Sequence, residues 1–364
     1  MSEGSFTIDA DIRAARTLPA RVYSDPEIFR AQRERIFART WQYVAHADVV
    51  KVPGQVYPFT LMPGTLDEPL VLARDPSDRV RCLSNVCTHR GTLVVEGAGV
   101  ESQLRCRYHG RRFTLDGGFH SMPEFDGAKD FPSPADDLAE IALGWIASFA
   151  FVSLSPAMTL AELFTPAMER RLEGVLRPFA FDAAGARDYL VNANWALYID
   201  NYLEGFHIPY VHTALADALD YGEYAVELDR FAVLQVGVAK EGEPVFALPD
   251  RHPDAGRRVA AYYWWLFPTT MLNVYPWGIS VNVVTPLAVD RTRVSFLPFV
   301  WDESRRTQGA GGAIDRVERE DEAIVESVQR GVRSRIYDRG RYSPARETGV
   351  HHFHRLLAEF MISR

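Results

Sequence analysis

The arrangement of apolar and polar residues divides the first part of the chain into a short helix and a β-rich region. Asp25 before Pro26 is typical of a helix start, and the helical pattern runs to about Phe37. From Trp41 to about Leu154, apolar residues alternate with polar ones in short runs. Turn residues separate four of these runs, which cover 43–50, 55–61, 69–73 and 80–86. The alternation predicts an all-β module.

Beyond Ser155 and Pro156 the pattern mixes helices with longer strands. The predicted elements are a helix over 160–176, a strand over 188–193, a helix carrying Asn201, Glu204 and His207, long β-runs over 231–301, and a final helix over about 313–336. Strands grouped together, with helices at either end, predict an α+β domain.

These patterns divide the 364 residues into three segments. We expect residues 41–155 to form the β domain and residues 156–364 to form the α+β domain. Residues 1–40 are expected to be a helical segment that packs on the C-terminal domain. A chain of this length is sufficient for two modest domains.

Composition narrows the class of protein. Apolar residues make up 47% and charged residues 24%, as in globular proteins. The net charge of −8 and the lack of a basic run argue against a nucleic-acid partner. The longest apolar run, 141–154, is too short to cross a bilayer, so no membrane partner is expected. Residues 1–5 are polar and the cysteine number is odd, which together predict a cytoplasmic location without disulfides.

Two cysteine–histidine arms are the first candidate for metal chemistry. Cys87 and His89 form a Cys-x-His arm, and after sixteen residues Cys106 and His109 form a Cys-x-x-His arm. One thiolate and one imidazole from each arm make the ligand set of a Rieske [2Fe–2S] cluster. The alternative is a structural zinc site that adds Cys82 to Cys87, Cys106 and His109. Cys82 lies within a predicted strand and is more simply a buried apolar residue.

A second candidate centre combines two histidines with a carboxylate. His207 and His212 flank Pro209, which interrupts the helix and allows both imidazoles to point inward. Asp321 lies at the centre of the apolar stripe of the last helix, where a carboxylate is costly unless paired or bound to a metal. That stripe consists of Ile314, Val317, Ile324, Val325, Val328 and Val332. Two histidines and one carboxylate suit a non-haem Fe(II). The alternatives are structural histidines and an ion pair between Asp321 and a buried arginine.

The motifs together resemble the α subunits of Rieske non-haem iron oxygenases. The resemblance covers nearly the whole chain, and it is closest to the branch of choline, glycine betaine and carnitine monooxygenases. Beyond the two arms, it is carried by Asn194-Trp195, Asp200-Asn201, Glu204-x-x-His207-x4-His212, Glu320-Asp321 and Glu326-Ser327-Val328-Gln329. It implies a helix-grip catalytic domain on an antiparallel sheet, following the β cluster domain.

The resemblance also implies the roles of the site residues. Cys87, His89, Cys106 and His109 would hold the [2Fe–2S] cluster, and His207, His212 and Asp321 would hold a mononuclear Fe(II). Glu204 would link His207 to a cluster histidine of the neighbouring subunit in a head-to-tail homotrimer. A separate flavin and iron–sulfur reductase would deliver electrons from NAD(P)H. The partners would then be O2, that reductase and a small-molecule substrate.

The expected reaction is hydroxylation of a small substrate, ending in oxidation or demethylation of a betaine-like quaternary-ammonium compound. Hydroxylation of an aromatic or other small carboxylate is the alternative, and a Rieske electron carrier with a ligand-binding domain is the non-enzyme alternative. No single substrate-binding residue is predicted. Aromatic residues at 195–206 and 262–277 are candidates for a cage around a trimethylammonium group.

Two further expectations concern residues outside the motifs. Arg105, Arg107, Arg111 and Arg112 flank the second arm and are expected to dock it on the Glu204 region or on a reductase, unless they form a solvated strand edge. Arg111 departs from the family pattern, in which many members carry tryptophan after the His-Gly pair. The histidine-rich segment 351–354 is expected to be a packed polar tail.

Overall fold

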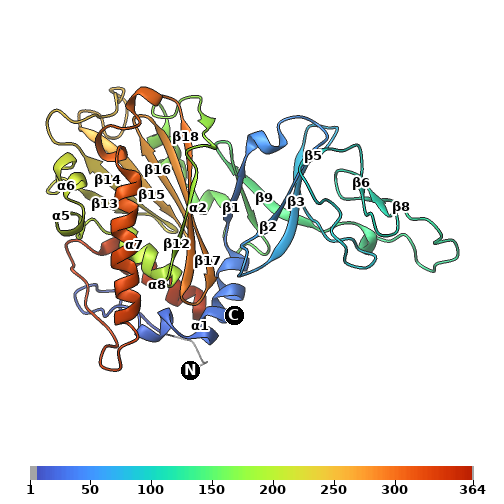
Figure 1. Ribbon diagram of the computed structural model, residues 1–364, viewed down its shortest axis with the longest axis horizontal. Helices are drawn as coiled ribbons and strands as arrows, with labels where there is room; N and C mark the ends of the chain where they lie inside the picture. The colour runs from blue at the N-terminus through green and yellow to red at the C-terminus, as the bar shows by residue number, and fades with distance from the viewer. Residues whose placement is uncertain (1–5, 363–364) are drawn as a thin grey trace. The chain divides into compact units, whose positions relative to one another are not determined.

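The chain folds into two compact units, Met1–Phe37 together with Met158–Arg364, and Ala38–Ala157 (Figure 1). The computed structural model describes residues 6–362, so the polar start at residues 1–5 lies outside the described residues. In the described part of the chain, no helix combines the length and apolar character needed to cross a bilayer.

The unit Ala38–Ala157 is all-β, as the alternating pattern predicts. A seven-stranded antiparallel sheet has the order β1-β10-β9-β4-β3-β2-β5, and β6-β7-β8 form a small second sheet. The strands are β1 Gln42–His46, β2 Gln55–Leu61, β3 Glu68–Arg74, β4 Val80–Ser84, β5 Gly99–Val100, β6 Leu104–Arg105, β7 Arg112–Phe113, β8 Phe119–Ser121, β9 Glu140–Ile146 and β10 Phe149–Ser153. The run predicted over 43–50 was too long, because a 3-10 turn at Ala47–Val50 follows His46.

Arg111 is a structural residue of this unit. Its side chain is only 2% exposed, and its Nη2 donates to the Asp136 carboxylate at 2.6 Å and to the Asp136 carbonyl at 3.1 Å. The guanidinium carbon lies 5.0–5.6 Å from the ring centres of Phe113, Phe119 and Phe131. The hydrogen bond from Arg111 is the main cause that holds the pKa of Asp136 below its usual range.

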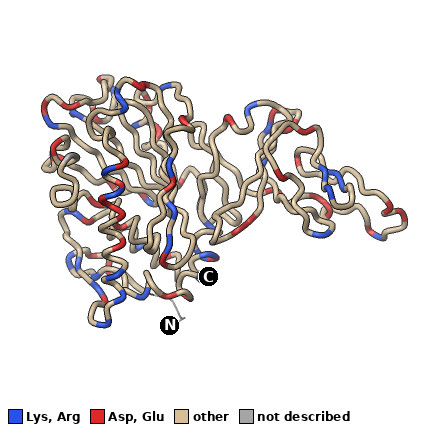
Figure 2. The backbone as a smooth tube through the Cα atoms, in the orientation of Figure 1, with Lys and Arg blue, Asp and Glu red and all other residues tan. Residues whose placement is uncertain are grey.

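The docking role expected of Arg111 is therefore wrong, because its charge is enclosed by three rings and a carboxylate. Arg105, Arg107 and Arg112 are exposed and form the basic group around β6 and β7 in Figure 2. Of these, Arg107 pairs with Glu96 at 3.3 Å.

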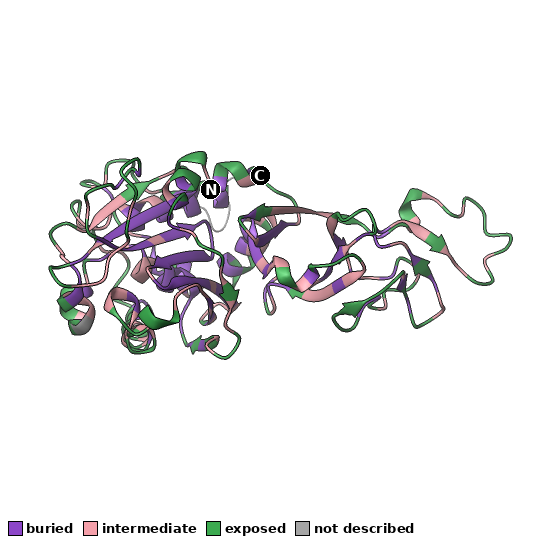
Figure 3. Ribbon diagram, turned by 90° about the horizontal axis from the view of Figure 1, so that it is seen from above, coloured by how far each residue is buried: buried purple, intermediate pink, exposed green. Residues whose placement is uncertain are grey.

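The other unit is built on an eight-stranded antiparallel sheet of order β11-β18-β17-β16-β15-β14-β13, with β12 also paired to β18. Figure 3 shows most of its strands buried, and every residue of β16 is buried. The strands are β11 Ala180–Phe181, β12 Arg187–Val191, β13 Ala225–Leu228, β14 Ala232–Val238, β15 Val259–Leu266, β16 Thr270–Tyr275, β17 Gly278–Ala288 and β18 Arg291–Val300.

Eight helices belong to the described part of this unit, and α7 crosses one face of the large sheet (Figure 1). They are α1 Pro26–Arg35, α2 Leu160–Leu163, α3 Pro166–Leu172, α4 Trp195–Tyr202, α5 Ile208–Val211, α6 Thr213–Ala218, α7 Ile314–Gly331 and α8 Thr348–Ile362. Helix α1 starts as expected, since Asp25 accepts a hydrogen bond from the Glu27 backbone N–H. Its Gln32 accepts from Trp195 Nε1 at 3.0 Å.

Two helix predictions need correction. The single helix over 160–176 is two short helices, because Pro166 begins a new helix at α3 instead of continuing α2. The segment 351–354 is packed as expected, but it belongs to helix α8 and is not a tail, and His351 and His354 are buried. His354 is held by Asp200 at 2.7 Å and by the Tyr342 hydroxyl at 2.6 Å, so its polar ring is satisfied inside the core.

Replacing Asp136 by Asn tests how far Arg111 depends on its counter-charge. Asparagine keeps an oxygen acceptor but removes the charge, which leaves the guanidinium buried among apolar rings. We expect the variant to lose about 3 kcal/mol in free energy of unfolding, the low end of the range for breaking a buried ion pair. Urea denaturation followed by tryptophan fluorescence measures the loss.

The matched control is Asp126→Asn, which changes an exposed aspartate of the same unit. It should change the free energy of unfolding by less than about 0.5 kcal/mol. Equal stability of the two variants would show that the Arg111–Asp136 pair contributes nothing.

Candidate metal centres

The two cysteine–histidine arms lie in loops that repeat the same turn. The N–H of Gly91 donates to the Cys87 carbonyl at 3.0 Å, and the N–H of Gly110 donates to the Cys106 carbonyl at 3.1 Å. Both glycines have positive φ, 75° and 77°, which other residues rarely adopt. Each turn therefore begins at its cysteine. The histidine follows two residues later in the first loop and three residues later in the second.

The structure brings the four cluster candidates together. Cys87 and Cys106 are buried and their thiols hydrogen-bond each other, and burial is the main cause that raises the pKa of Cys87. The rings of His89 and His109 lie 4.8 Å apart between centres. Among the described residues, the buried His109 Nδ1 has no hydrogen-bond partner. Two thiols beside two imidazoles, one with an unpaired buried nitrogen, fit the ligand set of a Rieske cluster.

Cys82 lies apart from the loops, in the interior of the sheet. It occupies β4, paired with Leu72 on one side and with Ile141 on the other. The side chain is fully buried, and burial raises the pKa of its thiol to about 12. This is the buried apolar role expected from its position in a strand.

The second group of residues forms where α4 ends. The predicted helix over 201–207 is too long, because α4 stops at Tyr202 and leaves Glu204 and His207 in the turn before α5. Glu204 folds back on this turn. One of its oxygens contacts His207 Nδ1 at 2.6 Å, and the other accepts from the backbone N–H groups of Phe206 and His207. A turn instead of a shared helix face thus joins Glu204 to His207.

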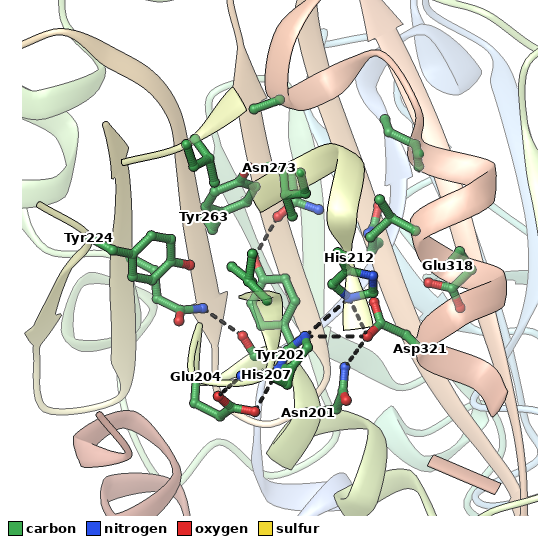
Figure 4. Close-up of a pocket in the computed structure, with 18 of the residues that line it drawn as sticks. Asn201, Tyr202, Glu204, His207, His212, Tyr224, Tyr263, Asn273, Glu318 and Asp321 are labelled. Carbon is green, nitrogen blue, oxygen red and sulfur yellow. Dashed lines mark hydrogen bonds and ion pairs between the residues drawn. The ribbon is translucent and has the colours of Figure 1, made fainter. Parts of the chain in front are cut away.

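His207, His212 and Asp321 converge on one point (Figure 4). The two Nε2 atoms lie 3.2 Å apart, and Asp321 Oδ1 lies 3.0 Å from His212 Nε2 and 3.5 Å from His207 Nε2. The fold brings Asp321 from α7 to the turn that carries the histidines, more than a hundred residues earlier in the chain. Asn201 orients its carboxylate by donating to Oδ1 at 2.6 Å.

The hydrogen bonds behind this point indicate which atoms face a metal. His207 Nδ1 meets Glu204, and His212 Nδ1 meets Glu320 Oε2 at 2.8 Å. When each Nδ1 donates its proton to a carboxylate, each Nε2 presents a lone pair to the other and to Asp321. Three acceptors at these distances fit a divalent cation between them. The donor set is that of a non-haem Fe(II) centre.

Two acidic residues of α7 were missed by the sequence reasoning. Glu320 was noted only as part of the Glu320-Asp321 motif, but it holds His212. Glu318 was not singled out, although it is 3% exposed and lies three residues before Asp321. The stripe was also wrong for Ile324 and Val328, which are 40% and 43% exposed. The 3–4 spacing of Glu318, Asp321, Val325 and Gln329 was the signal for the true buried face.

A pocket opens beside the three converging side chains, which form part of its lining. Of the expected cage, Tyr198, Tyr202, Tyr263 and Tyr275 line this pocket, together with Tyr224 and Phe296. Trp195 does not, because it is buried between Phe37 and Phe353. The amide side chains of the lining are Asn201, Gln235, Asn273 and Asn282. Tyr202 donates to Asn273 Oδ1 at 2.5 Å, so the aromatic wall is held in place by the amides.

Comparison with known proteins identifies both units. Residues 40–132 match the Rieske [2Fe-2S] domain, and residues 180–363 match the ring hydroxylating alpha subunit (catalytic domain). The chloroplastic choline monooxygenase of Arabidopsis thaliana is 30% identical, over 95% of this chain and 83% of the relative. The carnitine monooxygenase oxygenase subunit of Escherichia coli K12 is 30% identical, over 96% of this chain and 95% of the relative.

Solved structures agree with these matches. A quaternary ammonium Rieske monooxygenase, described in terms of carnitine oxidation and inter-subunit electron transfer, is 26% identical with a TM-score of 0.79, covering 98% of this chain and 99% of that one. Naphthalene 1,2-dioxygenase from a Rhodococcus species is 19% identical with a TM-score of 0.75, over 95% and 94% of the two chains, and shares the fold.

These matches confirm the predicted fold, a Rieske domain followed by an α+β catalytic domain. They also confirm the predicted cofactors, a Rieske cluster and a mononuclear iron, with a separate reductase as the source of electrons. They exclude the zinc-site alternative and the electron-carrier alternative. This chain belongs to the ring-hydroxylating α-subunit family of Rieske non-haem iron oxygenases.

Proposed function

We propose that this oxygenase hydroxylates a quaternary-ammonium compound at an N-methyl group or an adjacent C–H bond. The observation that carries the proposal is the tyrosine-lined pocket directly beside His207, His212 and Asp321. Aromatic faces attract a desolvated trimethylammonium group through cation–π interactions. The choline and carnitine monooxygenases among the relatives support the same substrate class.

The reaction consumes O2, two electrons and two protons. One oxygen atom enters the C–H bond and the other leaves as water. A hydroxylated N-methyl group then breaks down to formaldehyde and the demethylated amine. The electrons come from NAD(P)H through the separate reductase.

For the two metal centres we propose the ligands that the sequence indicated. Cys87, His89, Cys106 and His109 hold the cluster, and His207, His212 and Asp321 hold the mononuclear iron. When bound, the cluster supplies the electron and the Fe(II) supplies oxygen activation. The chain orients these ligands: Glu204 and Glu320 fix the tautomers of the two histidines, and Asn201 fixes the carboxylate of Asp321.

Glu204 is proposed as the connection between the two centres, acting between subunits of a head-to-tail homotrimer. Its hydrogen bond to His207 Nδ1 connects Glu204 to the mononuclear iron site. The inter-subunit electron transfer described for the similar monooxygenase supports a second contact, from Glu204 to a cluster histidine of the neighbouring subunit. We further propose domain limits of 41–155 and 156–364, with residues 1–40 attached to the catalytic domain, and a cytoplasmic location consistent with three free cysteines.

The substrate class is tested by oxygen uptake. The reduced holoprotein, supplied with a reductase and NADH, is given choline, glycine betaine, carnitine and simple aromatic acids in turn. We expect uptake with formaldehyde or aldehyde formation only for quaternary-ammonium compounds. Coupled turnover of an aromatic acid, with none of the quaternary-ammonium compounds active, would contradict the proposal.

Removing Asp321 tests the mononuclear site. We expect Asp321→Ala to lower the iron content from about three to about two atoms per chain, because the cluster keeps its two irons. Visible absorption of the cluster should remain, and oxygenation should be abolished. Asp315→Ala, which removes a carboxylate from the same helix outside the metal site, should keep all the iron. Retained oxygenation in Asp321→Ala would refute the ligand assignment.

Neutralising Glu204 tests the electron path. Glu204→Gln keeps the size of the side chain but alters the bond that fixes His207, so we expect steady-state turnover to fall by about 10–100-fold. Chemical reduction of the cluster should proceed as in the native protein, whereas its reoxidation in the presence of substrate and O2 should slow. Glu204→Asp should restore part of the rate. Unchanged reoxidation in Glu204→Gln would remove Glu204 from the path.

A further inference from the structure

The pocket contains a buried carboxylate that the metal site does not use. Glu318 lies one helical turn before Asp321 on α7 and lines the same pocket (Figure 4). Its Oε2 accepts a hydrogen bond from the Tyr198 hydroxyl at 2.7 Å. Among the described residues, its buried Oε1 has no hydrogen-bond partner. A carboxylate buried in this way is costly unless a positive group or a donor completes it.

No cationic side chain of the described lining compensates Glu318. The residues around the pocket include neither Lys nor Arg. The neighbouring Arg319 is 63% exposed and pairs with Glu322 at 3.3 Å. A divalent ion held at the metal site would face Asp321, with Glu204 and Glu320 behind the histidines. Burial is the main cause that raises the pKa of Glu318 to about 8, so a positive group beside this carboxylate would favour its charged form.

A second unpaired acceptor belongs to another residue of the same lining. Gln235 lines the pocket, and its Nε2 donates to the Tyr202 carbonyl at 2.6 Å, which fixes the orientation of the amide. Its Oε1 is buried without a partner among the described residues. Both unpaired buried atoms of the lining, Glu318 Oε1 and Gln235 Oε1, are acceptors. A ligand that satisfies them must bring positive charge or hydrogen-bond donors.

Building on the proposed function, we propose that Glu318 is the counter-charge for the ammonium group and selects substrates with a net positive charge. The favoured substrate class is a small quaternary-ammonium cation without a carboxylate, such as an amino alcohol of the choline type. Its hydroxyl would donate to an acceptor such as Gln235 Oε1. A betaine or carnitine would also bring a carboxylate into this pocket, where the lining offers no Lys or Arg to pair with it. Burying that carboxylate without a counter-charge would cost its desolvation energy and weaken binding.

The proposal is tested by calorimetric binding to the anaerobic, iron-loaded holoprotein. The probes are tetramethylammonium and choline as cations, and glycine betaine and L-carnitine as zwitterions. We expect both cations to bind at least about tenfold more tightly than either zwitterion. Glu318→Gln should weaken choline binding on the order of 30-fold, as expected when one partner of a buried charge pair is lost. Binding of the zwitterions should stay the same or improve.

Glu322→Gln is the matched control, since it changes a partly buried glutamate of the same helix outside the pocket. It should leave every dissociation constant unchanged. The order of affinities in the native protein tests the proposal even if Glu318→Gln does not fold.

The outcomes separate this proposal from the proposed function. Zwitterions that bind as tightly as cations, or a Glu318→Gln variant with native choline affinity, would overturn the role of Glu318 and leave the quaternary-ammonium function standing. Failure of all four probes to bind would overturn both.

Discussion

The catalytic unit is organised around the convergence of two imidazoles and one carboxylate on a single point. The Nε2 atoms of His207 and His212 and the Oδ1 atom of Asp321 lie within 3.0–3.5 Å of one another. When each Nδ1 carries the proton, the three facing atoms present lone pairs that repel at these distances, and partial burial reduces the screening by water. The atoms stay together because Glu204 and Glu320 hold the opposite side of each imidazole. A divalent cation bound between these atoms would convert this repulsion into attraction, so a metal here would complete the structure as well as the chemistry.

Buried polar contacts away from the metal site keep α7 in the position that this contact requires. Gln329 Oε1 accepts from the Asn194 backbone N–H at 2.7 Å, just before α4, and Gln329 Nε2 donates to the Tyr23 carbonyl at 3.3 Å. Glu326 accepts from the backbone and side chain of Asn192 at 2.9 and 2.8 Å. The helix that carries Asp321 is thus fixed to the start of the helix that precedes the histidines. Directional hydrogen bonds of this kind fix how far α7 is shifted along its own axis. Apolar packing alone would allow the helix to shift.

How much could be predicted from the sequence depended on how local each feature is. The cluster arms could be chosen from spacing alone, because cysteine and histidine lie in one loop each. Asp321 could be chosen from the cost of a carboxylate on an apolar face. Glu320 could not, because its contact with His212 depends on where α5 ends relative to α7.

The errors have physical causes of the same kind. Periodicity defines a helix face, but it does not say how far the core extends around it, so Ile324 and Val328 were placed inside although they are exposed. Glu318 was overlooked because a glutamate counts as polar in any hydropathy pattern, whatever its surroundings. The length of α4 was overestimated because the helix ends at a turn formed by a side chain, Glu204, that bonds to backbone N–H groups.

The two units use the same combination of aromatic rings and a carboxylate in different ways. In the Rieske unit, Phe113, Phe119 and Phe131 surround a cation that the chain supplies itself, Arg111, and Asp136 neutralises it. In the catalytic unit, tyrosine rings and Glu318 surround a space to which the described lining contributes no cationic side chain. The first arrangement pairs its charge within the fold and contributes to stability. The second gains its favourable energy only when a cation enters from outside, and this difference makes one a structural element and the other a recognition site.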